Sequence, residues 1–102
     1  MTDNLQIAET IRRQLGANRF TAMTGARDFY AIESGLQFRL PSNFARDGIN
    51  CVRVTLDASD TYSVRFIKTR GMSVKECGTL SGIYADQLRR VFTERTGLET
   101  SI

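Results

Sequence analysis

The 102-residue sequence predicts a single α+β domain: an antiparallel meander of four to five strands, flanked by an N-terminal and a C-terminal helix on one face. Three observations support this prediction. Apolar residues recur at helical spacing near both ends of the chain, they alternate with polar residues in between, and the alternating segments are joined by short connections. Helices that cover one face of such a sheet leave its other face to solvent.

Both predicted helices rest on an apolar stripe whose members are three or four residues apart. The stripe of the first helix comprises Leu5, Ala8, Ile11 and Leu15. The stripe of the second, predicted over residues 83–96, comprises Tyr84, Leu88, Val91 and Phe92. Asp3 is suited to cap the first helix, and Gly16 and Gly97 are suited to end the two helices.

Several segments between the helices alternate as strands do. They are "RFTAMTGA", "DFYAIES", "GLQFRLP" and "RGMSVKECGTL". In the last of these, Met72 and Val74 are expected to face the core and Lys75 to face outward. The longest irregular stretch is residues 42–50, which contains Phe44. That side chain either covers the core under the loop or is an exposed anchor for a partner.

The segment "VRVTLDASDTYSVRF", which starts at residue 52, reads as two strands and a tight turn. Placing its apolar residues in one core layer sets Val54 opposite Val64 and leaves residues 58–60 as a three-residue loop. The same register sets Arg53 opposite Arg65 on the other face. Two like charges side by side on a sheet are unfavourable, so this pair needs an explanation.

The composition disfavours several classes of function. The chain has a net charge of +3 and no histidine, which is the commonest general base and metal ligand. Cys51 and Cys77 belong to no CxxC pair, and we expect reduced thiols, with a disulfide between neighbouring strands as the alternative. The N-terminus does not resemble a signal peptide, and no apolar stretch approaches the roughly 20 residues of a membrane span. The expected compartment is the cytoplasm, with no membrane partner.

No catalytic or cofactor motif appears, since the sequence has neither GxGxxG nor GK[ST]. Asp57 and Asp60 fall at a turn, where aspartate is favoured for local hydrogen bonds, and a metal or acid–base role is the alternative. Cys77 lies beside Lys75 and Glu76, and it would be a reactive thiol only if its pKa were lowered. The sequence therefore predicts a non-enzymatic protein without cofactor or metal.

Basic residues form the most informative pattern. Arg39, Arg53, Arg65 and Lys75 occupy predicted outward strand positions, and Arg70 lies at a turn. On adjacent strands these five would make one positive stripe on the open face, which is the predicted partner-binding surface. Three interpretations remain open: a solvated face, contact with an anionic protein surface, and contact with nucleic acid. The aromatic residues Phe38, Tyr62 and Phe66 are expected to point to the buried face, which counts against a base-stacking platform. The C-terminal helix offers a second basic patch: Arg89, Arg90 and Arg95.

Four segments carry a resemblance that covers nearly the whole chain. They are "IRRQLGANRFTAMTGARDF", "GLQFRLP", "INCVRVTLDASDTYSVRF" and "VKECGTLSGIYADQLRRVFTERTGL", with "QLGANRFTAMTGA" as the most specific marker. With these segments the sequence resembles a family of small, mostly uncharacterised proteins encoded by phages and mobile elements of bacteria. The resemblance implies a genomic setting, and it assigns no functional residue.

Small phage-borne proteins without an active site commonly act by binding. This expectation comes from analogy with such proteins and not from the predicted fold. The resemblance therefore implies an accessory protein that binds a host or phage protein with an acidic surface, for instance to inhibit a restriction or CRISPR defence. The alternatives are a nucleic-acid-binding accessory protein and a module that self-associates, as a homodimer, through an exposed strand edge. A DNA mimic is disfavoured because the chain is net positive.

Overall fold

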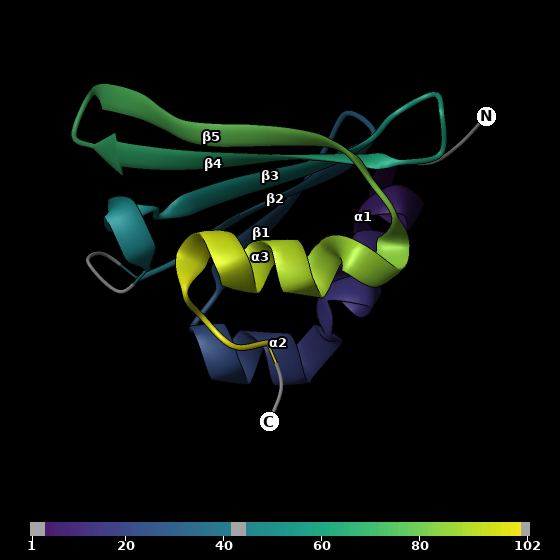
Figure 1. The fold of residues 1–102 in the computed structure, drawn as a ribbon, viewed down its shortest axis with the longest axis horizontal. Helices are drawn as coiled ribbons and strands as arrows, with labels where there is room; N and C mark the ends of the chain where they lie inside the picture. The colour runs from purple at the N-terminus through teal and green to yellow at the C-terminus, as the bar shows by residue number, and fades with distance from the viewer. Residues whose placement is uncertain (1–3, 42–44, 101–102) are drawn as a thin grey trace.

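A five-stranded antiparallel sheet forms one layer of the protein, and helices form a second layer against one of its faces (Figure 1). The computed structural model describes residues 4–41 and 45–100. Its helices are α1 (Asn4–Leu15), α2 (Ala17–Thr24) and α3 (Leu88–Thr96), with short 3-10 turns η1 (Arg46–Gly48) and η2 (Ala85–Gln87). Its strands are β1 (Arg27–Ile32), β2 (Gly35–Arg39), β3 (Cys51–Leu56), β4 (Tyr62–Arg70) and β5 (Ser73–Ile83). Strand order follows the chain, so the predicted α+β meander is confirmed. Asp3 and Phe44 lie outside the described residues.

The core lies between the sheet and the helices and is built around three phenylalanines. The Phe20 ring of α2 lies 5.3 Å from the Phe38 ring of β2 and 5.0 Å from the Phe92 ring of α3, both in edge-to-face geometry. All three side chains are buried. Aromatic pairs in this arrangement add to the stabilisation from burial alone. Phe20 therefore connects the sheet to helices from both ends of the chain.

The segment "RFTAMTGA" is helical, so the strand predicted there is wrong. Its buried residues are Phe20 and Thr24, one helical turn apart, whereas Ala22 is exposed. Gly16, at φ 126°, allows the chain to change direction between α1 and α2, and Gly25 ends α2 in the left-handed region. In eight residues with few apolar members, the helical period of 3.6 cannot be distinguished from the strand period of 2. The packing of Phe20 therefore decides that the segment is a helix.

The hairpin of β3 and β4 has the predicted register. Val54 is paired with Val64 and Arg53 with Arg65, which confirms that the two arginines are cross-strand neighbours. Asp60 adopts φ 62° in the three-residue loop, and the Asp57 N–H donates to the Thr61 carbonyl at 2.8 Å. A loop with its last residue in the left-handed region is a common hairpin closure.

Other expectations about side-chain burial need correction. Met72 and Val74 do not face the core: they are 103% and 70% exposed. Met72 lies in the turn of the β4–β5 hairpin beyond the covered sheet, and Val74 is paired with Thr69 on the face away from the helices. In the first helix Leu5 is exposed and Ile7 is buried in its place. The C-terminal helix begins later than predicted, since β5 runs to Ile83.

The ends of the helices agree with the sequence. α1 ends at Leu15, directly before Gly16, and Gly97 caps α3 in the left-handed conformation with φ 77°. The Gly97 N–H donates to the Thr93 carbonyl, which satisfies one of the last free acceptors of the helix.

Replacing Phe20 with alanine should lower the free energy of unfolding by about 3–5 kcal/mol, because it removes a fully buried ring from two aromatic contacts. Urea unfolding followed by circular dichroism measures this. Arg19→Ala, at the exposed neighbouring position of α2, is the control and should change stability by less than about 0.5 kcal/mol. A loss below about 1 kcal/mol for the Phe20 variant would contradict its central place in the core.

Candidate anion-binding face of the sheet

The sheet face away from the helices carries four arginines in two cross-strand pairs. Arg27 of β1 is paired with Arg39 of β2, and Arg53 of β3 with Arg65 of β4. Directly paired residues of antiparallel strands project to the same face. All four side chains are exposed, and the alternate positions of β2, β3 and β4 are buried against the helices. We call this surface the open face.

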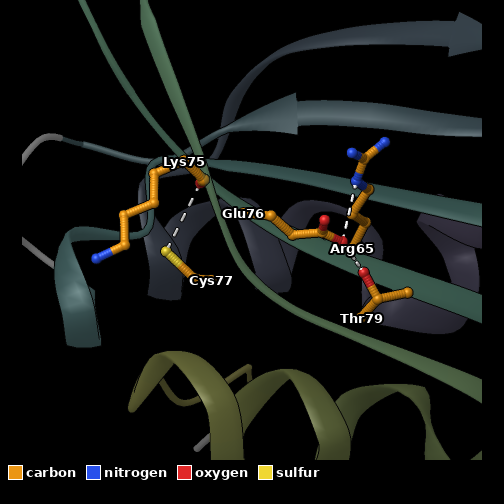
Figure 2. A network of polar contacts seen from close by, with 5 residues as sticks. All are labelled: Arg65, Lys75, Glu76, Cys77 and Thr79. Carbon is orange, nitrogen blue, oxygen red and sulfur yellow. Dashed lines mark hydrogen bonds and ion pairs between the residues drawn. The ribbon is translucent and has the colours of Figure 1, made fainter.

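Neighbouring side chains hold three of these arginines in place. Arg53 Nε donates to Gln37 Oε1 at 2.7 Å, and an Arg39 guanidinium nitrogen donates to Thr69 Oγ1 at 3.1 Å. Arg65 Nε lies 3.3 Å from Glu76 Oε1 (Figure 2). The Nε atoms of Arg53 and Arg65 each contact a neighbouring side chain, so the orientation of both guanidinium groups is restricted. Their remaining N–H donors therefore have restricted directions too.

A hollow of about 270 Å³ lies beside the Arg53–Arg65 pair. Its lining combines guanidinium groups with hydroxyl groups and one apolar side chain: Arg53, Arg65, Thr55, Ser63, Thr79 and Ile32. Gly35 lies in β2 between Ile32 and Thr55, to which it is paired on either side. A Cβ at Gly35 would come within 2.2 Å of the Val54 carbonyl oxygen, so close approach of these strands requires glycine there. The absent side chain also leaves the hollow open.

Glu76 partly neutralises one end of the open face. Its carboxylate accepts a hydrogen bond from the Thr79 hydroxyl and pairs with Arg65 (Figure 2). The Thr79 hydrogen bond, followed by the charge of Arg65, lowers the pKa of Glu76 below its usual value. Arg53 instead contacts the uncharged Gln37. The positive charge available to an anion is therefore concentrated on Arg53, Arg39 and Arg27.

The structure separates the five residues of the predicted stripe into two groups. Arg39, Arg53 and Arg65 share the open face, but Lys75 is paired with Lys68 and Arg70 with Ser73, on the opposite face of the β4–β5 hairpin. In Figure 2, Glu76 extends toward Arg65 while Lys75 extends the other way. For Lys75 the cause is a bulge: Phe66 is paired with Gly78 and Ile67 with Glu76, so Cys77 is an extra residue that reverses the alternation of β5 toward the turn. Arg70 lies five residues after Arg65 on β4, so regular alternation alone directs it to the opposite face.

Two members of the open face were missed from the sequence. Arg27 and Tyr30 belong to β1, where Tyr30 is paired with Gln37 and is 57% exposed. The alternation of this strand is interrupted by a register shift between Arg27 and Tyr30, with Asp28 at φ 55°. Phe38, Tyr62 and Phe66 are buried as expected, and Tyr30 adds an exposed aromatic ring to the open face.

The cysteines are free thiols in different surroundings. Cys51 is buried on the open face, and burial raises the pKa of its thiol, although the charges of Arg53 and Arg39 oppose this. Cys77 packs against the core, with its Sγ 3.9 Å from the Lys75 carbonyl oxygen (Figure 2). Neither thiol has a partner that would activate it as a nucleophile among the residues described.

The remaining candidates have local structural roles. Asp57 accepts a hydrogen bond from the Ser63 hydroxyl at 2.7 Å, and Asp60 closes the hairpin loop, as the turn interpretation expects. Arg95 lies over the Phe66 ring, 5.9 Å from its centroid, where Gly78 leaves space. Arg89 and Arg90 are exposed on α3.

Within residues 4–41 and 45–100, no group of three or more acidic or cysteine side chains is placed to hold a metal ion, and no helix is long and apolar enough to cross a membrane. Comparison of the chain with protein-family models, with curated proteins and with solved structures found no match.

Replacing both Arg53 and Arg65 with threonine should leave the free energy of unfolding within about 0.5 kcal/mol of the original value, or raise it slightly. The substitution removes a like-charge pair and an exposed ion pair with Glu76, and exposed ion pairs contribute little to stability. Urea unfolding measures the change, and the double lysine variant, which retains both charges, is the control. A loss above about 1.5 kcal/mol would show that the pair stabilises the fold.

The Glu76 carboxyl should titrate below its ordinary value of about 4.3 in an NMR pH titration. Thr79→Val and Arg65→Thr should each raise this pKa, because each removes a partner that stabilises the carboxylate. A folded-state pKa below the unfolded one means that the carboxylate contributes stability above the unfolded pKa and loses it as the pH falls through the folded pKa. An ordinary pKa in the unaltered protein would contradict the Arg65–Glu76–Thr79 arrangement.

Proposed function

We propose that this chain is a non-enzymatic binding module whose open face contacts an acidic surface of a protein partner. The observation that carries the proposal is the exposed Arg53–Arg65 pair beside its hollow. A like-charge pair on a sheet costs stability in the free protein, and carboxylates of a partner would offset that cost. The hydroxyls of Thr55 and Ser63 add short polar groups around the place where such a carboxylate would lie.

The composition of the open face also suits a protein interface. Arginine and tyrosine are the residue types that most often dominate binding energy at interfaces, and the open face presents Arg27, Arg39, Arg53 and Tyr30 together. Side chains already held by Gln37 and Thr69 lose less freedom on binding than mobile ones. The open face therefore offers both anchors and pre-organisation.

The resemblance to small phage and mobile-element proteins supports a partner from the host or the phage. We propose an accessory role, in which the module occludes an acidic surface of a host defence protein. Occlusion needs no catalytic group, which agrees with the local roles found for the aspartates and thiols.

Nucleic acid is the second candidate for the open face, and Tyr30 is the observation that favours it. An exposed aromatic ring among arginines can stack on a base while the cations contact phosphates.

Self-association through a strand edge has less support. Both edge strands contain register shifts, in β1 near Asp28 and in β5 near Cys77, and such irregularities protect an edge from pairing.

Affinity capture from a nuclease-treated bacterial host lysate tests the proposal. The immobilised chain should retain a protein, and Arg53→Thr combined with Arg65→Thr should reduce the retained amount by about tenfold, which corresponds to the loss of one strong ionic contact. Arg89→Thr combined with Arg90→Thr removes the same charge from α3 and should retain it fully. Equal capture by both double variants would contradict the proposal. Capture that is lost only on nuclease treatment would favour nucleic acid.

A further inference from the structure

The β4–β5 hairpin continues beyond the rest of the sheet as a two-stranded arm (Figure 1, far left). The pairing of β3 with β4 ends at Cys51 and Ile67, whereas β4 and β5 stay paired to Arg70 and Ser73. We define the arm as residues 68–75. Its base is fixed by Asn50, whose side chain bonds both the carbonyl and the N–H of Thr69 at 2.8 Å.

One face of the arm is cationic. Lys68 and Lys75 are direct cross-strand partners, and Arg70 follows on the same face. The arm contains no acidic residue. Outside the arm, two acidic side chains, Asp47 of η1 and Glu76, share a hollow with Lys75. Lys68 lies against η1, since a Cβ at Gly48 would be 3.0 Å from Lys68 Cε. A second like-charge pair thus stands apart from the open face.

The end of the arm is apolar and unsupported. Met72 in the turn is fully exposed, and Val74 is 70% exposed. Gly71 adopts φ 59° in this turn, and no atom lies within 4 Å of the position that its Cβ would take. These exposed apolar side chains contribute nothing to the core. Contact with a ligand therefore explains their placement better than packing within the protein does.

We propose that the arm enters the major groove of double-stranded DNA, with its cations against phosphates and Met72 against the bases. The major groove is about 12 Å wide and admits a two-stranded ribbon, whose strands lie about 4.8 Å apart. In the major groove the thymine methyl group is the apolar feature that a side chain can contact, and Met72 is the exposed apolar side chain in the turn of the arm. The deep, narrow major groove of duplex RNA does not admit such a ribbon.

Charge and shape favour DNA over an acidic protein at this place. A protein partner would need a cleft to receive a narrow projection, whereas duplex DNA presents a groove with regularly spaced phosphates on both sides. The proposal is independent of the open face, because Lys68, Arg70 and Lys75 point to the opposite side of the hairpin. A failure of one proposal leaves the other standing.

Fluorescence anisotropy with a labelled DNA duplex of about 20 base pairs tests the arm. Three phosphate contacts predict a slope of about −2.7 for log affinity against log salt, or an affinity loss of about 40-fold between about 50 and about 200 mM. Arg70→Gln combined with Lys75→Gln should bring the slope close to about −1. Met72→Ser should weaken binding about fivefold at both salt concentrations without changing the slope.

Three comparisons keep the test specific. Arg89→Gln combined with Arg90→Gln makes the same change of net charge on α3 and should leave affinity within about twofold. Arg53→Thr combined with Arg65→Thr should also bind DNA normally, although we expect it to reduce partner capture. The absence of DNA binding at about 50 mM salt would overturn the proposal, as would equal binding of duplex RNA or polyglutamate, or equal losses in the arm and α3 variants.

Discussion

Burial of one apolar row from each of β3 and β4 determines the chemistry of the opposite face. Val52 and Val54 of β3 and Val64 of β4 are buried against the helices. Because side chains alternate along a strand, the residues between them must face away, and Arg53 and Arg65 become neighbours. A slip of one residue would bury an arginine, which is far more costly than an exposed like-charge pair. The core therefore creates the open face.

The bulge at Cys77 then divides the basic surface in two. Before the bulge, on the side of Ile83, the odd-numbered residue Thr79 of β5 is paired with Arg65 on the open face. Beyond the bulge, toward the turn, the even-numbered residue Glu76 projects to the open face near Arg65, and Lys75 is paired with Lys68 on the opposite face. One extra residue in β5 thus gives Arg65 an acidic neighbour and places Lys75 on the same face as Lys68 and Arg70 of β4. It also sets Gly78 over the core, where Arg95 of α3 lies against Phe66.

The sequence was sufficient to predict the structure where the periodicity of apolar residues and the residues of the turns indicated the same element. The register of β3 with β4 followed from the alternation around Arg53 and from the loop before Thr61, and each is local information. The helix around Phe20 was not predictable in the same way, because tertiary packing decides between two periods in so short a segment. The positions of Arg27 and Lys75 depended on irregular pairing in β1 and β5, which alternation alone does not reveal, whereas the position of Arg70 follows from the regular alternation of β4.

The packing of Phe92 against Phe20 has a consequence for how the chain folds during synthesis. Each strand pairs with its neighbour in sequence, so the meander can form hairpin by hairpin as it leaves the ribosome. The apolar face of that sheet nevertheless stays incompletely covered until α3, close to the C-terminal end, supplies Leu88 and Phe92. The core therefore becomes closed to water, and protected from association with other chains, only once α3 has packed against the sheet and α2.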